Sequence, residues 1–444
     1  MDKLLEKVYS MTPEDTERCK PHLMIGGGHP GPTLCTGKGI RVTDINHKTY
    51  IDCTSQSWAL YLGYANEEIR EIVYEHMGHL GAHIHQGFNT QVRYALAEKL
   101  TSIAPKDLNR VSFTASSGLG IEAAMKIALK NVPGSRKFIV LDDAYHGNSL
   151  TTAAASWTST KAKGDFTGVK TFANGLNDLF IRVPNPYLYH WNKTENPEDC
   201  IDYCLDAMKN ALQREVCGQV AGIILEPIQA SGGQIPLPKR YLEGVRKLAD
   251  EFGCLLIFDE IQTYCRIGEY FAAIHYDVEP DVICLGKALG AGFPMAAIII
   301  HDRLEGFSMN AEELHTFANN SVSQICALKQ LEIIERDHLL ENTKKVGKIL
   351  GDGIKGMMKE FPEIGDVRQV GLHIGVEMVK DPETKEPLLA ADTIRARAME
   401  NGLILGTAGF RKNILKVKPP LITTPEDAAE ILDKWETALK LSLR

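Results

Sequence analysis

Long apolar segments are missing from the 444-residue sequence. Its longest uninterrupted apolar stretches, such as Leu255–Phe258 and Met295–Ile300, are far shorter than the roughly 20 residues that cross a bilayer. A surplus of basic residues is missing too, because 49 Lys and Arg stand against 57 Asp and Glu, which gives a formal net charge of -8. No overall basic field attracts a polyanion. We therefore expect neither a membrane nor nucleic acid as a partner.

Signals for disulfides and for metal binding are also absent. None of the ten cysteines forms a CxxC pair, and residues 1–12 mix acidic and basic side chains without the apolar core of a secretion signal. Reduced thiols in a cytoplasmic protein are therefore expected. The densest group of possible metal ligands consists of four histidines: His76, His79, His83 and His85. Gly78 and Gly81 interrupt the helix that would align them, and no HExxH pattern follows, so no metal is expected.

What the sequence does contain is the pattern of an α/β protein. Apolar residues make up 44% and charged residues 24%, as in an ordinary globular protein. From about residue 110 to 300, short apolar or β-branched runs alternate with helical patterns, which predicts a mostly parallel sheet flanked by helices. The strands expected in this large domain are 111–113, 138–141, 220–225, 254–258, 282–285 and 297–300.

The last third of the chain has a different character. Residues 339–358 and 424–441 show helical periodicity and residues 371–378 have the pattern of a strand, which together predict a smaller α+β domain. Alternating polar and apolar residues from 42 to 53 predict a hairpin that belongs with it. We expect a large domain between two segments that combine into the small one, with boundaries at 1–55, 56–305 and 306–444.

Three groups of polar residues directly follow expected strands, at the edge of an α/β sheet where ligands bind. Asp259 and Glu260 follow the fourth of these strands, and Gly286 and Lys287 follow the fifth. A loop of serine and glycine follows the first strand and precedes a helix. Such a loop offers N–H groups and the positive end of a helix dipole to a phosphate. Its residues are Ser116, Ser117, Gly118 and Gly120.

These three groups together suit a phosphorylated aldehyde. A lysine in a partly desolvated pocket loses its proton near neutral pH and attacks a carbonyl. Pyridoxal 5'-phosphate (PLP) needs such a lysine, a carboxylate for its ring nitrogen and a phosphate cradle, and Tyr145 is placed to stack on its ring. Each pattern alone has a structural alternative: Lys287 in a solvated turn, Asp259 as a helix cap, the loop as a plain turn and Tyr145 in core packing.

The order of these segments resembles that of the class III aminotransferases, a family of fold-type-I PLP-dependent enzymes. The resemblance covers nearly the whole chain, from Val42 to Leu421. The segments that carry it are Phe113–Gly118, Tyr145–Gly147, Leu225–Gln229, Phe258–Thr263 and Leu285–Lys287. The resemblance implies that Lys287 forms a Schiff base with PLP and that Asp259 pairs with the pyridine nitrogen.

The same resemblance implies the rest of the cofactor site. Ser117 and Gly118 would donate to the phosphate, and Gln262 would lie near the ring hydroxyl. The ring-stacking motif contributes Tyr145 and His146, and a strand-end signature contributes Glu226. Thr316 looks like the residue that family members lend to the phosphate of a neighbouring subunit, which implies a two-fold symmetric dimer with shared sites.

Departures from the family's pattern bear on the substrate. Many members place an arginine where this chain has Lys416, and that arginine grips a substrate carboxylate with a bidentate fork. A lysine supplies charge without the fork. Strand alternation puts Lys416 and Lys418 on one face. A lysine at position 416 resembles a branch of the family that acts on phosphorylated amines. Two solvated lysines at an edge are the alternative. Further substrate contacts implied by similar enzymes are Trp58, His83, His85 and Tyr264, although core aromatics and solvent-facing histidines are the alternative.

The sequence thus predicts a PLP-dependent enzyme that moves an amino group from a primary amine or amino acid to a 2-oxo acid. On the same scaffold, racemisation or epimerisation, decarboxylation and elimination of phosphate remain open alternatives. A non-catalytic PLP-binding protein and a metal hydrolase built on the four histidines are hypotheses from other classes.

Overall fold

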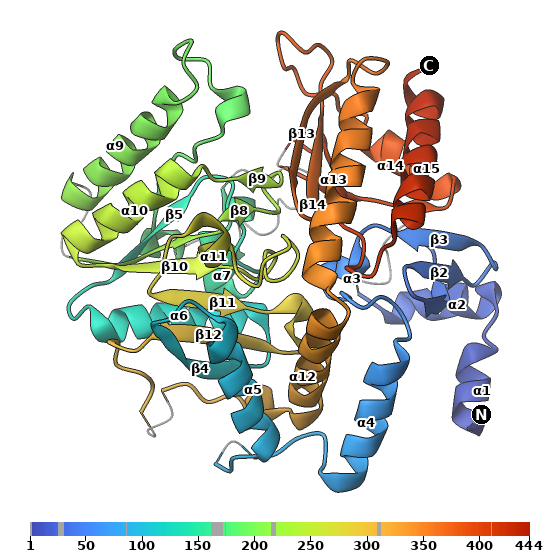
Figure 1. Ribbon diagram of the computed structural model, residues 1–444, viewed down its shortest axis with the longest axis horizontal. Helices are drawn as coiled ribbons and strands as arrows, with labels where there is room; N and C mark the ends of the chain where they lie inside the picture. Colours follow the sequence, from blue (N-terminus) through green and yellow to red (C-terminus); the bar gives the residue numbers. More distant parts are fainter. Residues whose placement is uncertain are drawn as a thin grey trace.

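The computed structural model is organised around a seven-stranded sheet (Figure 1) and describes residues 2–24, 31–85, 87–160, 172–173, 175–214, 219–308, 312–409 and 411–444. The strand order is β4-β12-β11-β10-β7-β5-β6. Strand β12 runs antiparallel to both of its neighbours, and the remaining pairs are parallel. The mostly parallel sheet expected from the sequence is confirmed. Its strands are β4 (Leu108–Thr114), β5 (Lys137–Leu141), β6 (Phe180–Val183), β7 (Val220–Leu225), β10 (Leu255–Asp259), β11 (Val282–Leu285) and β12 (Ala296–His301).

Strand β10 shows why this sheet is buried on both faces. Alternate residues of its apolar run enter two different clusters of packed side chains, Leu256 and Phe258 in one and Leu255 and Ile257 in the other. Helices α9 (Asp199–Arg214) and α10 (Lys239–Phe252), which lie side by side in Figure 1, pack into the first cluster. Helix α6 (Ser117–Asn131) packs into the second. Helices therefore cover both faces of the sheet.

Two smaller sheets bring the ends of the chain together. One joins the N-terminal strands to a C-terminal strand, in the order β1-β2-β3-β15, and the other has the order β13-β14-β17-β16. The hairpin expected between residues 42 and 53 is confirmed, because β2 and β3 pair antiparallel. Figure 1 shows it beside helix α15 (Pro425–Leu443), where Arg41 forms an ion pair of 2.8 Å with Asp427. The domain boundaries near residues 55 and 305 stay a prediction.

The strands of the smaller sheets are β1 (Leu34–Lys38), β2 (Arg41–Asp44), β3 (Thr49–Asp52), β13 (Ile364–Val370), β14 (His373–Met378), β15 (Leu403–Ile404), β16 (Gly406–Ala408) and β17 (Ile414–Val417). A further pair is β8 (Ile228–Gln229) with β9 (Ile235–Pro236). The other helices are α1 (Lys3–Tyr9), α2 (Pro13–Cys19), α4 (Glu67–His79), α5 (Gln91–Ile103), α7 (Leu150–Ala155), α11 (Ala272–Tyr276), α13 (Leu339–Met357) and α14 (Ala391–Glu400). Within the described ranges, no helix combines the length and apolar character that a bilayer crossing requires.

Helix α12 (Ser321–Arg336) supports the site and was not anticipated from the sequence. It buries several polar residues, among them Ser323 and Gln330, so its apolar periodicity is interrupted. Both of these side chains donate a hydrogen bond to a neighbouring loop. The Ser323 hydroxyl donates to the carbonyl of Pro294 at 3.0 Å, and Nε2 of Gln330 donates to the carbonyl of Ala288 at 2.7 Å. The helix thereby holds the turn that follows β11.

Candidate active site

One cavity at the carboxyl ends of the parallel strands collects most of the expected cofactor-binding residues. Because these strands end at the same edge of the sheet, residues far apart in the chain meet there. The lining residues are Ser117, Tyr145, His146, Gly147, Glu226, Asp259, Ile261, Gln262 and Lys287. Gly118 is the neighbour of Ser117 in the first turn of α6.

Asp259 is held at the end of β10 as a buried carboxylate. Its Oδ2 lies 2.8 Å from Nδ1 of His146, and its Oδ1 accepts a hydrogen bond of 3.2 Å from the backbone N–H of Ile261. The backbone N–H of His146 is itself fixed by the hydroxyl of Ser156 at 2.9 Å. With Asp259 ionised, Nδ1 of His146 is the donor in this hydrogen bond. Ser156 could not be picked out from the local sequence, because it lies 103 residues before Asp259 and supports that carboxylate through His146.

Glu226 holds the segment that carries the aromatic ring. Its Oε1 accepts a hydrogen bond of 2.8 Å from the backbone N–H of Tyr145, and its Oε2 accepts one of 3.0 Å from that of Ala230. Burial, together with the negative charge of Asp259, raises the pKa of Glu226 to about 7. Glu226 therefore fixes the backbone of Tyr145 at the cavity wall.

Lys287 opens the turn after β11 in a strained conformation. It is half-buried and has φ of 47°, in the left-handed region, where a non-glycine residue costs roughly 1–3 kcal/mol. Burial lowers the pKa of Lys287, while the charges of Asp259 and Glu226 oppose that shift. Gly286 allows the turn to lie close to α6, because a Cβ there would be 2.2 Å from Oγ of Ser117. The amine is thus brought toward its neutral, nucleophilic form.

The start of α6 forms a cradle for an anion. Among the described residues, Ser116 at the N-cap makes no side-chain hydrogen bond to the helix start, and Ser117 in the first turn lines the cavity. The N–H groups of this turn therefore suit an anion. Gly147 closes the cradle with φ of 134°, and a Cβ there would lie 2.5 Å from Oγ1 of Thr152. Glycine at position 147 therefore lets this segment lie close to Thr152 on α7.

These residues fit PLP. The helix start matches the phosphate, the buried carboxylate of Asp259 matches the ring nitrogen, and Lys287 supplies an amine of lowered pKa for the aldehyde. Tyr145 lines the cavity as an aromatic side chain, although burial and the charge of Glu226 raise the pKa of its phenol.

Two buried lysines adjoin this cavity. Nζ of Lys418 donates to Oε1 of Gln262 at 2.9 Å, and the Nζ atoms of Lys416 and Lys418 lie 4.0 and 5.0 Å from the ring centre of Trp58. The predicted shared face is confirmed, and the alternative of two solvated lysines is wrong, because the side chains are 6% and 0% exposed. Burial, with the charge of Lys287 adding to it, lowers the pKa of Lys416 to about 7.

Positive and neutral groups surround these lysines. His373 on β14 is buried, and neither ring nitrogen has a hydrogen-bond partner among the described residues. Burial and the charges of Lys418, Arg266 and Lys416 hold the pKa of His373 well below its usual range. This cluster was not found from the sequence, because Arg266 and His373 are more than 100 residues apart. It favours an acidic ligand.

Trp58 reaches the lysines from a left-handed turn. The turn labelled α3 is formed by four residues with φ of 45°, 48°, 58° and 68°: Ser55, Gln56, Ser57 and Trp58. An L-residue costs roughly 1–2 kcal/mol in this region. Strain of this kind persists only where surrounding contacts over-determine the backbone.

The remaining candidates lie outside the cavity lining. Tyr264 is in the core, 5.7 Å from the ring of Phe271. His83 packs edge-on against Phe317 at 5.1 Å, and His85 is exposed. Thr316 lies on an exposed turn, η8 (Thr316–Asn319). Sequence alone does not distinguish these core and surface positions from cavity positions.

The histidines proposed for a metal hydrolase do not converge. Within the described part of the chain, the residues close enough to share an ion are Asp107, Glu279 and His301, on the opposite edge of the sheet from Lys287. Helix α4 ends at His79, as the glycines predict. The metal-hydrolase hypothesis therefore has no geometric support from His76 to His85.

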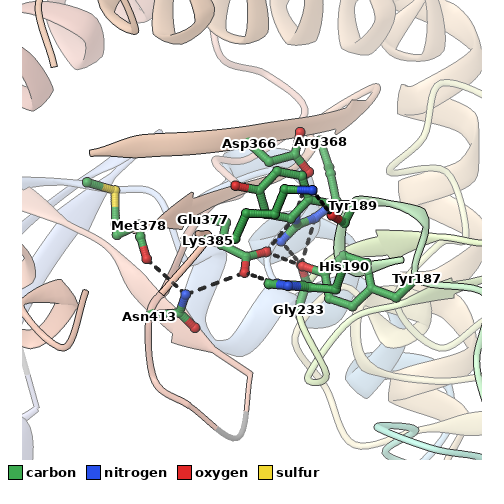
Figure 2. Close-up of polar contacts among 10 residues, drawn as sticks. All are labelled: Tyr187, Tyr189, His190, Gly233, Asp366, Arg368, Glu377, Met378, Lys385 and Asn413. Carbon is green, nitrogen blue, oxygen red and sulfur yellow. Dashed lines mark hydrogen bonds and ion pairs between the residues drawn. The ribbon is translucent and has the colours of Figure 1, made fainter. Parts of the chain in front are cut away.

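A second polar cluster links a small sheet to the large one (Figure 2). Glu377 on β14 is surrounded by donors: Nη1 of Arg368 lies 2.8 Å and Nε2 of His190 2.6 Å away, and the hydroxyl of Tyr187 also donates. Burial opposes ionisation, but the bond to His190 and the charge of Arg368 hold the pKa of Glu377 at about 2. Arg368 also donates to the carbonyl of Gly233 at 2.8 Å. The cluster thus fixes the loop that follows Glu226.

Comparison with known proteins gives consistent matches over the chain. The family model "Aminotransferase class-III" matches residues 30–439. A probable 4-aminobutyrate aminotransferase of Bacillus subtilis is 33% identical, over 91% of this chain and 92% of that protein. An alanine/serine racemase of Pyrococcus horikoshii is 32% identical, over 92% of this chain and 85% of that protein. An amine transaminase from an uncultivated Pseudomonas species, solved in a PLP-bound form, superposes with a TM-score of 0.84 at 25% identity, over 93% of this chain and 95% of that one.

Proposed function

The chain belongs to the class-III aminotransferase family and is a PLP-dependent aminotransferase, and we propose that Lys287 carries its PLP and that Lys416 binds the acidic end of its substrates. The substrates are an amine or amino acid and a 2-oxo acid. The observation that supports the assignment of Lys287 is the meeting of its amine with the carboxylate of Asp259 and the start of α6 in one cavity.

Each residue has a distinct proposed role. When bound, PLP supplies an aldehyde and a protonated ring that withdraws electrons from the substrate carbon. Nζ of Lys287 would hold the aldehyde and would move the substrate's proton as general acid and base. Asp259, fixed by His146, keeps the ring nitrogen protonated. Tyr145 covers one face of the ring.

The polar ends of the cofactor have their own proposed partners. The backbone N–H groups of Ser117 and Gly118 bind the phosphate, and Gln262 lies near the ring hydroxyl. The bond from Lys418 fixes the carboxamide of Gln262, and Glu226 keeps the stacking segment in place.

The acidic end of the substrate is proposed to lie between Lys416 and Trp58. Three further cationic or neutral groups face Lys416: Lys287, Lys418 and His373. Glu226 contributes the opposing negative charge. The compact ammonium group of Lys416 can bind either a carboxylate or a phosphate. Lys416 therefore selects for an anion without imposing the fixed geometry of an arginine fork.

Lys416 predicts a pH-dependent affinity. Because the pKa of Lys416 is about 7, its charge is present below that pH and is lost as pH rises through 7. We expect kcat/KM for an acidic 2-oxo acid to fall above pH 7, while that for an aldehyde acceptor without an acidic group does not show this step. Lys416→Met should remove the step and raise the KM for the acid roughly 10- to 100-fold. Unchanged KM in Lys416→Met would contradict the assignment.

The test of the reaction follows the amino group. Purified protein is incubated with amine donors and with 2-oxoglutarate or pyruvate, and the products are separated by chiral chromatography. Formation of the amino acid of the acceptor supports amino transfer. Scrambled stereochemistry with exchange of the α-hydrogen, and no consumption of the acceptor, would instead support racemisation, the activity that the name of the Pyrococcus horikoshii relative gives.

A second copy of the chain is the proposed partner. Three large apolar side chains are exposed near Thr316: Phe88, Leu314 and Phe317. His83 contacts Phe317 from the same surface, so a two-fold dimer through it would bring Thr316, His83 and His85 toward the other subunit's cavity. Sedimentation is expected to give twice the 49.1 kDa of the chain. Phe317→Asp should lower that mass and weaken PLP binding, and a monomer of full affinity would contradict the shared site.

A further inference from the structure

The left-handed turn before Trp58 is organised by one buried carboxylate. Asp52, at the end of β3, is 0% exposed. Its Oδ1 accepts hydrogen bonds from the backbone N–H of Thr54 at 2.7 Å and from the hydroxyl of the same residue at 2.6 Å. Its Oδ2 accepts from the backbone N–H of Gln56 at 3.1 Å, from Nε2 of Gln56 at 3.3 Å and from the hydroxyl of Tyr64 at 2.9 Å. The two oxygens therefore anchor both the entry and the middle of the turn.

The turn is also tied to the strand that carries the lysines. The hydroxyl of Ser55 donates to the carbonyl of Lys418 at 2.7 Å, and Nη2 of Arg266 donates to that hydroxyl at 3.3 Å. Trp58 closes the turn with its backbone N–H bonded to the carbonyl of Thr54 at 2.8 Å. Its ring centre thereby lies 4.0 Å from Nζ of Lys416 and 5.0 Å from Nζ of Lys418.

Trp58 adds a polar atom beside the two lysines. Its Nε1 is buried and has no hydrogen-bond partner among the residues that the structure describes. In their charged form the two lysines are donors as well, so they do not then accept from the indole. A donor left in this way is costly unless an acceptor enters. The placement of the indole therefore matters for the same anion that the lysines attract.

We propose that Asp52 is a positioning residue that holds the strained turn Ser55–Trp58 and thereby sets the place of the Trp58 indole beside the substrate's acidic group. Asp52 lies outside the cavity lining, and its bonds to the turn are those to Thr54 and Gln56. The left-handed backbone has no glycine to favour it, so the hydrogen bonds to Asp52 replace the conformational freedom that glycine would give. The substrate part of this inference rests on the assignment of Lys416 proposed above.

The test compares Asp52→Asn with Asp52→Asn/Ser57→Gly in the holoenzyme. The asparagine keeps the size of the side chain but replaces one acceptor oxygen with an NH₂ group. That group faces the hydrogen-bond donors of either Thr54 or Gln56 and Tyr64. Ser57 is exposed, and glycine adopts its φ of 58° without strain. Near-UV circular dichroism measures how well Trp58 is ordered. Its contribution is the part of the signal that is lost when Trp58→Phe is added to each variant. The KM and kcat for 2-oxoglutarate and the visible absorbance of the cofactor are recorded alongside.

We expect Asp52→Asn to lose most of the Trp58 signal and to raise KM roughly 10- to 100-fold, with kcat and the cofactor absorbance nearly unchanged. Adding Ser57→Gly should restore part of both the signal and the KM. If Asp52→Asn does not fold, recovery of folding and of the signal by Ser57→Gly supports the same role, and no recovery overturns it. A folded Asp52→Asn with the full Trp58 signal also overturns it. Loss of the signal with unchanged KM supports the positioning role and contradicts instead the substrate assignment of Lys416.

Discussion

Replacement of Lys287 by alanine is expected to abolish amino transfer, with kcat lowered by roughly 10⁴-fold or more. The substitution removes the amine that binds the cofactor aldehyde and the base that moves the substrate proton, so two functions are lost together. Burial favours the neutral amine of Lys287. The two neighbouring lysines are not expected to replace it, because Nζ of Lys418 donates to Gln262 and Nζ of Lys416 lies over the ring of Trp58.

The covalent link gives a readout apart from activity. Borohydride treatment of the native holoenzyme should attach the cofactor to the peptide that contains Lys287, as mapped by mass spectrometry, and Lys287→Ala should leave that peptide unmodified. The control is Lys348→Ala, since Lys348 is exposed and pairs with Asp352. It should keep both activity and labelling. Labelling of another lysine in the native protein would show that the cofactor is held elsewhere.

Local sequence predicts the parts of this site that follow from strand periodicity. The apolar run before Asp259 defines a strand buried on both sides, and a residue directly after such a strand must lie at the sheet's edge. The same reasoning places Lys287 after β11. These are short-range consequences of the strand's period, so they need no knowledge of the rest of the chain.

The contacts that tune those residues are long-range and could not be predicted in this way. His146 and Asp259 are 113 residues apart in the chain. Gln330 supports the turn of Lys287 from helix α12, whose buried polar residues interrupt the apolar pattern that would predict a helix. The turn Ser55–Trp58 contains no glycine, so its sequence does not predict a left-handed backbone. It exists because a carboxylate from the preceding strand, Asp52, supplies hydrogen bonds that the local sequence does not reveal.

The burial of Lys416 and Lys418 could not be predicted from the sequence either, because it depends on contacts with distant segments. Alternation assigns both to one face of a strand but does not say what covers that face. Here β17 pairs with β14 and β16 on its two sides, and Trp58 covers the lysines from the N-terminal part of the chain. Three segments distant in sequence thus turn a pattern typical of a solvated edge into a buried cationic site.

Asp259→Asn is expected to lower kcat roughly 10²- to 10³-fold while the protein keeps its fold. The amide preserves the shape of the side chain but removes the negative charge that favours a protonated ring nitrogen, so the ring loses its strength as an electron acceptor. The visible absorbance of the bound cofactor should change its pH dependence. The bond to His146 can be kept with the amide oxygen as acceptor, so the melting temperature should change little.

The neighbouring carboxylate provides the matched control. Glu260 is buried as well, but it accepts hydrogen bonds from the backbone N–H of Ala273 at 2.9 Å and from the hydroxyl of Thr263 at 2.8 Å, and is absent from the cavity lining. Glu260→Gln should therefore destabilise the protein by about 1–3 kcal/mol and leave the cofactor absorbance and kcat of the folded protein nearly unchanged. The two adjacent acids would then separate cleanly, one in chemistry and one in stability. Equal losses of kcat in both variants would mean that Asp259 also acts only through the fold.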